Sequence, residues 1–100
     1  MPDLNISVPH QLQQDEALRR IQTAIDRSKV QYKDHVSDLQ EHWNDNVGTL
    51  NLTVRGMAIP AQVTVNPSDV ALHAELPMIA SFFMGQIETT AREMLSRILS

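Results

Sequence analysis

The sequence predicts an α+β fold, a two-layer sandwich with a mainly antiparallel five-stranded sheet and two helices on one of its faces. Two patterns predict it. Apolar residues alternate with polar ones in five short segments, as in half-buried strands, and follow a helical stripe in two longer segments. Short turn sequences separate the last four strand segments, which favours an antiparallel meander. Because 100 residues with 42% hydrophobic content supply one core, we expect residues 1–100 to form a single α+β domain.

The chain begins with a strand and a helix. Leu4, Ile6 and Val8 alternate with polar neighbours, which predicts a strand. Pro9 ends it, because proline lacks a backbone donor. Residues 13–33 follow the helical period, with acidic residues in the first turn and lysines in the last, as the helix dipole favours. The apolar stripe of this helix consists of Leu18, Ile21, Ile25, Ser28 and Tyr32, with Ala17 and Ala24 at its edge.

Four further strands are expected, with one apolar and one polar face to their sheet. They lie at residues 38–44, 48–55, 58–66 and 70–76. The first of them is ambiguous, because Leu39, Glu41 and Trp43 share one face and Glu41 is not apolar. Pro60 predicts that its strand lies at an edge of the sheet or begins there, since proline cannot donate to a neighbouring strand.

A second helix is expected at residues 78–99. Its core stripe consists of Ile79, Phe83, Ile87, Ala91, Met94 and Ile98, with Ala80, Met84 and Leu95 widening it. Met78 and Phe82, four positions apart, lie off this stripe. They either pack under the first helix or a loop, or form an exposed patch that contacts a partner, a second copy of the chain or an apolar surface. Met78 and Phe82 are therefore the candidate interaction patch.

No group of residues has the pattern of a catalytic, cofactor-binding or metal site. His10, His35, His42 and His73 lack metal-ligand spacing, and the 3 glycines form no phosphate-binding loop. Cysteine is absent, so there is no thiol nucleophile. We expect a protein that is not an enzyme and binds no cofactor or metal. His10 is expected to hydrogen-bond the chain that enters the first helix.

Charge and hydropathy restrict the classes of partner and the cellular compartment that we expect for this protein. The formal net charge is −4 and lysines and arginines do not cluster, which argues against a nucleic-acid partner. The longest apolar stretch is far short of the ~20 residues of a membrane-spanning helix, so no transmembrane segment is expected. The amino terminus lacks the pattern of a secretory signal, which predicts a cytoplasmic protein.

Several residues together resemble one known family over nearly the full chain. They are Pro9-His10 followed by Leu12 and Ala17, Trp43 and the turn after it, the meander with Gly56, Leu76-Pro77, and Gly85, Ile87 and Glu88. In this pattern the chain is similar to small bacterial proteins of the polyhydroxyalkanoic acid system, found in the context of polyester storage granules. It departs from the expected pattern at Gln13, where a Ser or Thr helix cap is absent. The resemblance implies a granule-associated or granule-regulatory role and carries over no catalytic residue.

Two hypotheses about function follow, with a homodimer as a third possibility. The first is a non-catalytic accessory protein of polyhydroxyalkanoate storage, which contacts the granule surface or a granule-associated protein through Met78 and Phe82. The alternative is a small-ligand binder or enzyme that uses a cavity between sheet and helices, lined by the adaptable side chains of Met57, Met78, Met84 and Met94. A homodimer would form through an exposed strand edge or through the Phe82 patch.

Overall fold

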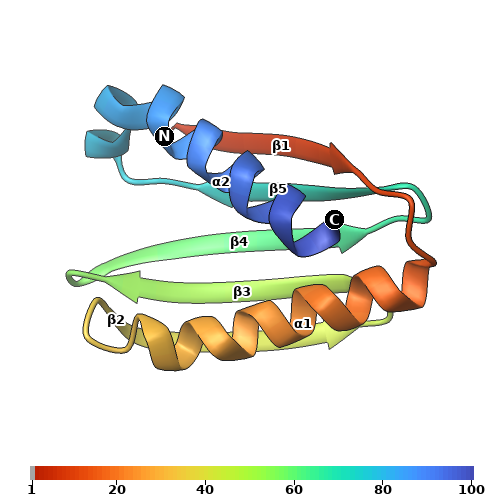
Figure 1. The fold of residues 1–100 in the computed structure, drawn as a ribbon. Helices are drawn as coiled ribbons and strands as arrows, with labels where there is room; N and C mark the ends of the chain where they lie inside the picture. Colours follow the sequence, from red (N-terminus) through yellow and green to blue (C-terminus); the bar gives the residue numbers. More distant parts are fainter. Residues whose placement is uncertain (1) are drawn as a thin grey trace.

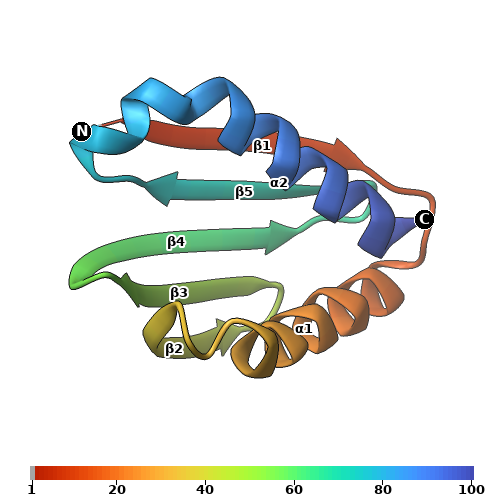
Figure 2. The ribbon, with the colours of Figure 1, turned by 60° about the vertical axis from the view of Figure 1, so that its left-hand side comes forward.

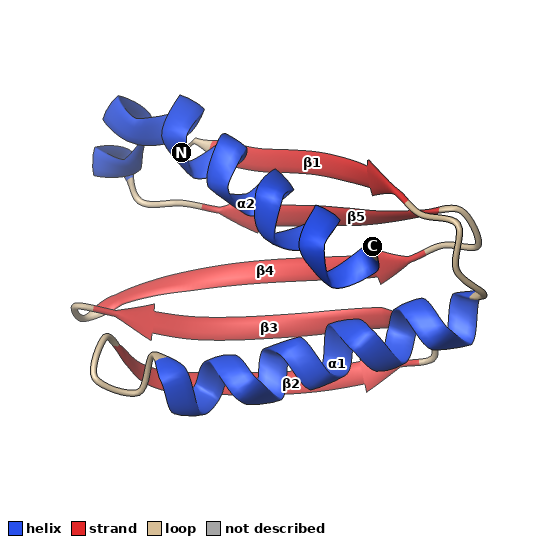
Figure 3. Cartoon of the chain, viewed as in Figure 1, coloured by secondary structure: helices blue, strands red, loops and turns tan. Residues whose placement is uncertain are grey.

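One antiparallel sheet of five strands carries both helices on the same face (Figures 1 and 3). The computed structural model describes residues 2–100. Its elements are β1 (Asp3–Pro9), α1 (Gln14–Gln31), β2 (Val36–Asn44), β3 (Val47–Val54), β4 (Met57–Val65), β5 (Asp69–Glu75), the 3₁₀ segment η1 (Met78–Phe83) and α2 (Met84–Leu99). The strands lie in the order β1-β5-β4-β3-β2, so the sheet is open and β1 and β2 are its edges. The α+β fold predicted from the sequence is confirmed.

Strand β1 pairs antiparallel with β5, although the two are separated by most of the chain. Leu4, Ile6 and Val8 lie opposite Ala74, Leu72 and Val70. The apolar face of β1 therefore continues the apolar face of β5 beneath the helices. Because β1 and β2 lie at opposite edges, the chain has to cross the sheet between them. Residues 10–13 lead away from β1, and α1 then runs along the β3 and β2 side of the sheet (Figure 2).

The buried core lies under the β1, β5 and β4 side of the sheet. Val65 and Val70 are fully buried, and Ala17 and Ile21 of α1 meet Leu95 of α2 above them. On the other side, β2 contributes no fully buried apolar side chain among the described residues, and its Leu39 and Trp43 are only half-buried. The helix layer is thus tightly packed over one half of the sheet and loosely packed over the other.

Glu41 explains why the alternation in β2 was ambiguous. Its side chain lies on the inner face with Leu39 and Trp43, and only 12% of it is exposed. There it accepts hydrogen bonds from Lys29 Nζ of α1 at 2.9 Å and from Trp43 Nε1 at 2.5 Å. A charged residue can occupy this inner position because both donors compensate for its desolvation.

The prediction for Pro60 is wrong, because β4 is a central strand and begins at Met57. Pro60 lies opposite Asn51 of β3. The ladder between β4 and β5 ends with the pair Ala61–Ala74, so Pro60 has no partner on the β5 side. The missing N–H of Pro60 therefore interrupts no hydrogen bond between β4 and β5. An edge strand tolerates proline for the same reason, because it has no neighbour on one side.

The second helix begins later than predicted, at Met84, because residues 78–83 form the 3₁₀ segment η1. With three residues per turn, η1 does not continue the 3.6-residue stripe of the helix. Ala80 is its one buried residue. The members of the predicted core stripe that are exposed instead are Ile79 at 61%, Phe83 at 55% and Met94 at 40%.

Gly48 is required by the indole ring of Trp43, which lies opposite it in the β2–β3 ladder. A Cβ at position 48 would be 2.7 Å from two carbons of that ring. Gly48→Ala should therefore lower the unfolding free energy by about 1–3 kcal/mol and the melting temperature by roughly 5–15 °C. Thermal unfolding followed by circular dichroism measures this. The control is Gly85→Ala in α2. A Cβ at position 85 would have no neighbouring atom within 4 Å, so the stability should stay equal or rise.

Gln13 occupies the N-cap of α1 without a side-chain cap, although its φ of −62° and ψ of 147° suit one. Gln13→Ser should satisfy one of the free N–H groups of the first turn and raise stability by about 0.5–1 kcal/mol. Urea unfolding of this variant should give a higher midpoint than the wild type. The same substitution at the exposed Gln11, outside the helix, should leave the midpoint unchanged. Equal midpoints for both variants would show that the helix start is already satisfied.

Candidate functional site

The segment η1 presents the large apolar side chains of Met78, Ile79, Phe82 and Phe83 to solvent, and we call these four residues the η1 patch. Met78 is 70% exposed and Phe82 is 82% exposed. The interpretation that they pack under the first helix or a loop is therefore wrong. A group of four exposed apolar side chains in one short segment is typical of an interaction surface.

The η1 patch is held in place by its own buried side. Ala80 is buried, its N–H donates to Pro77 O at 2.9 Å, and Met84 packs against the core. Just before the segment, Leu76 N–H donates to Pro2 O at 2.9 Å. The patch consequently lies at the end of the molecule where the chain begins (Figures 1 and 2). Residues 76–87 contain no charged side chain, so the surface is apolar and its immediate sequence is uncharged.

A second apolar feature is a cleft between α1 and α2 above the sheet, with a volume of about 260 Å³. Leu39, Leu50 and Leu52 form part of its floor, with Ile25 and Met94 on its walls. The sequence predicted a methionine lining for such a cavity. Of the four methionines named for it, Met94 alone is among the lining residues; Met57 lies in the β3–β4 hairpin and Met78 in the η1 patch.

The cleft exists because the two helices meet at one end and diverge toward the other (Figures 1 and 2). Where they meet, Arg20 Nη1 of α1 donates to Ser100 O at 2.7 Å and to Ile98 O at 3.3 Å. Ala17 and Ile21 pack into the core in the same half of α1. The carboxyl-terminal half of α1 lies away from α2, so the floor of the cleft is left partly open.

A second pocket adjoins the cleft at the carboxyl-terminal end of α1; most of its lining is apolar, and we call it the polar pocket because charged side chains border it. The two share Ser28, Leu39 and Leu52, and the polar pocket also includes Lys29, Tyr32, Lys33 and Asp38. Lys29 is held by Glu41 at 2.9 Å and by Asp26 at 3.5 Å. The hydrogen bond to Glu41 raises the pKa of Lys29. Lys33 forms no ion pair with any described residue.

The two hydrogen-bond donors of Glu41 stabilise the ionised form of its carboxyl group in spite of its burial. Burial alone would raise its pKa, but the hydrogen bonds from Lys29 and Trp43 outweigh that effect and the pKa lies below its ordinary value. A carboxyl group whose pKa is lower in the folded than in the unfolded state stabilises the fold at pH values above the unfolded pKa of 4.5. This stabilisation is lost as the pH falls through the folded-state pKa.

Removing this charge gives a pH-dependent prediction. Glu41→Gln should destabilise the protein at pH 7 by about 1–2 kcal/mol, because Lys29 loses its buried partner. The difference from the wild type should shrink as the pH falls below 4.5, and urea unfolding at several pH values measures it. Glu93→Gln on the exposed side of α2 serves as the control and should show no such convergence. A difference that is constant with pH would contradict the assigned role of the charge.

His10 has the structural role predicted for it. It is buried, and its Nδ1 accepts a hydrogen bond from Leu12 N–H at 3.1 Å, immediately before α1. The neutral ring then carries its hydrogen on Nε2, which donates to Asn66 O at 2.9 Å. His10 thus joins the entry to the helix to the turn between β4 and β5.

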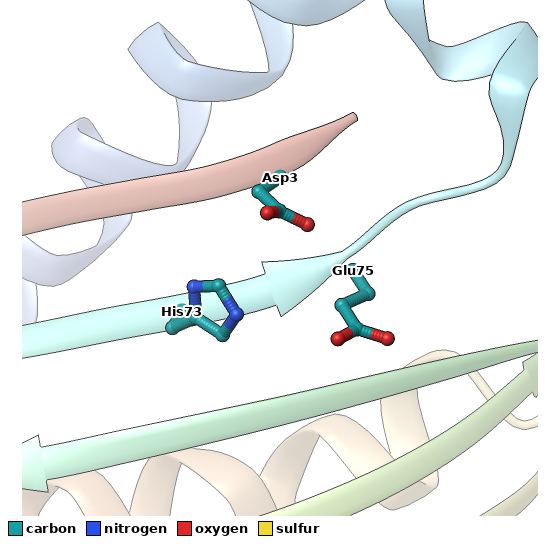
Figure 4. Close-up of side chains that lie close together, drawn as sticks. All are labelled: Asp3, His73 and Glu75. Carbon is teal, nitrogen blue, oxygen red and sulfur yellow. The ribbon is translucent and has the colours of Figure 1, made fainter. Parts of the chain in front are cut away.

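The outer, polar face of the sheet brings together three side chains that the sequence did not connect. The potential ligand atoms of Asp3, His73 and Glu75 lie within 4.8 Å of one another (Figure 4). Nδ1 of His73 is 2.6 Å from Asn5 Oδ1. The pairing of Asp3 with Glu75 in the β1–β5 ladder creates this cluster, so its only signal is a register that spans most of the chain. His42 lies on the same face but on the distant strand β2.

The fold and these surfaces describe a small α+β protein with an exposed apolar patch and an apolar cleft. The family model described as "Putative polyhydroxyalkanoic acid system protein" matches residues 4–99. The chain belongs to this family, as the resemblance in its sequence indicated. Comparisons with curated proteins and with solved structures found no match. Within residues 2–100, no helix is both long enough and apolar enough to cross a membrane.

Proposed function

We propose that this protein is a non-catalytic accessory protein of polyhydroxyalkanoate storage that binds the granule surface through the η1 patch. The family to which the chain belongs supports the polyhydroxyalkanoate context. The observation that carries the proposal is the exposure of four large apolar side chains, led by Phe82 at 82%. A storage polyester offers an apolar surface, and such a patch is complementary to it.

The apolar area suffices for reversible binding. Full burial of one Phe or Met side chain contributes about 1.5–3 kcal/mol. Because the four side chains are already partly covered, their transfer to an apolar surface would contribute on the order of 4–8 kcal/mol, which corresponds to dissociation constants of roughly millimolar to micromolar. Ala80 and Met84 hold the segment in place beforehand, so little additional ordering is needed on binding.

The charge distribution predicts how this binding responds to salt. The net charge is −4, and the residues that flank the uncharged stretch are Glu75 and Glu88. Glu88 is paired with Arg92, so this end of the molecule offers no excess of positive charge that would attract an anionic surface. Binding that depends on apolar burial should therefore persist, or strengthen, when salt screens these charges.

Co-sedimentation with isolated granules tests the proposal. Phe82→Ser should lower the affinity about 10- to 100-fold, because it removes about 1.5–3 kcal/mol of apolar burial. Val30→Ser is a matched control, since Val30 is 72% exposed but lies on α1, away from the patch, and should bind like the wild type. Absence of binding by the folded wild type would refute a granule-binding role. Unchanged binding by folded Phe82→Ser would refute only the proposed surface.

Light scattering distinguishes granule binding from pairing of two copies. The proposal predicts a monomer in solution when granules are absent. A dimer that dissociates in Phe82→Ser would instead assign the patch to a homodimer interface. A dimer that persists in this variant would point to the exposed strand edges β1 and β2.

A further inference from the structure

The cleft between α1 and α2 is lined in a way that suits an aliphatic chain. Its floor comes from the sheet and its two walls come from the helices, so it surrounds a ligand on three sides. Ser28 is its one polar lining residue, and the Ser28 hydroxyl already donates to Ala24 O at 2.9 Å. The cleft therefore offers an occupant mainly apolar contacts and no free hydrogen-bond donor.

The volume of the cleft restricts the occupant to a small molecule. An engineered apolar cavity of about 150 Å³ holds benzene, so a volume of about 260 Å³ corresponds to roughly ten carbon atoms. A single turn of an α-helix occupies about 420 Å³, from a diameter of about 10 Å and a pitch of 5.4 Å. A partner helix would thus require α1 and α2 to move apart, whereas one alkyl chain fits between them.

The adjoining polar pocket supplies the groups that a head group would contact. It shares Ser28 and two leucines with the cleft, so a molecule can extend from one into the other. Glu41 neutralises Lys29, which leaves Lys33 as the cation available to a carboxylate. Asp38 lines the same pocket and would repel a carboxylate placed beside it, but it can accept a hydrogen bond from a hydroxyl group.

From these features we propose that the cleft and the polar pocket together bind a medium-chain hydroxy carboxylic acid of roughly ten carbons. The alkyl chain lies between α1 and α2, the carboxylate pairs with Lys33, and the hydroxyl group donates to Asp38. The Tyr32 hydroxyl is a further hydrogen-bonding group in the same pocket. This site shares no residue with the η1 patch, so it does not depend on the proposed granule binding.

Isothermal titration of the full chain with 3-hydroxydecanoate, decanoate and decanol tests the site. The wild type should bind all three saturably, and 3-hydroxydecanoate most tightly. Lys33→Gln should weaken both acids about 10-fold and leave decanol unchanged. Asp38→Asn should abolish the preference for 3-hydroxydecanoate over decanoate. Arg27→Gln, which removes an exposed cation from α1 outside both pockets, is the matched control and should bind like the wild type.

Two variants that fill the cleft test whether the alkyl chain of the ligand binds there. Ala91→Phe and the smaller change Ala24→Leu place extra volume on opposite walls, and each should weaken all three ligands at least 10-fold while thermal unfolding confirms that the variant is folded. Phe82→Ser should leave ligand binding unchanged. The proposal is overturned if the wild type shows no saturable binding up to about 1 mM, if both folded filling variants bind normally, or if Phe82→Ser abolishes binding.

Discussion

The pairing of β1 with β5 determines where the molecule is tightly packed. It places Leu4, Ile6 and Val8 next to the apolar side chains of β5 and concentrates the core under α2 and the first half of α1. The chain must then cross to the opposite edge before the meander begins. The buried residues of α1, Ala17 and Ile21, lie in its first half, and Ile25 of its second half is partly buried against the same core.

The second half of α1 is held by an ion pair in addition to the packing of Ile25 against the core. The contact of Lys29 with Glu41 ties it to β2, while Val30 and Tyr32 are exposed. An ion pair with one largely buried partner, here Glu41, specifies a position without filling the space around it, since the two partners must meet at a fixed geometry. The apolar cleft is the consequence: α1 stays over the sheet, but its side chains do not close the space toward α2.

The η1 patch is exposed because few side chains of its segment reach the core. Ala80 is the one buried residue of this segment, and Phe83, which a 3₁₀ turn places on the same side, is still 55% exposed. The large apolar side chains of the η1 patch are left exposed. Such exposure lowers solubility, and a protein retains it most readily where the surface is used for contact.

Local patterns in the sequence sufficed for much of this structure. The five strands, the first helix and the apolar and polar faces of the sheet followed from periods of two and 3.6 residues. The role of His10 followed from its place beside Pro9, and the excess of apolar residues around Phe82 was visible on the helical stripe. Each of these features depends on residues that are close together in the sequence, so the sequence alone is enough to predict it.

Tertiary structure alone decided the remaining features. The inward position of Glu41 depends on Lys29 of another element, the tolerance of Pro60 depends on where the β5 ladder ends, and the cluster around His73 depends on Asp3. The divergence of the helices, and hence the cleft, depends on which half of α1 reaches the core. The sequence determined which face of each helix and strand is apolar. The packing of distant segments decided which of these apolar side chains are buried, because periodicity identifies the faces of an element and not the element that covers them.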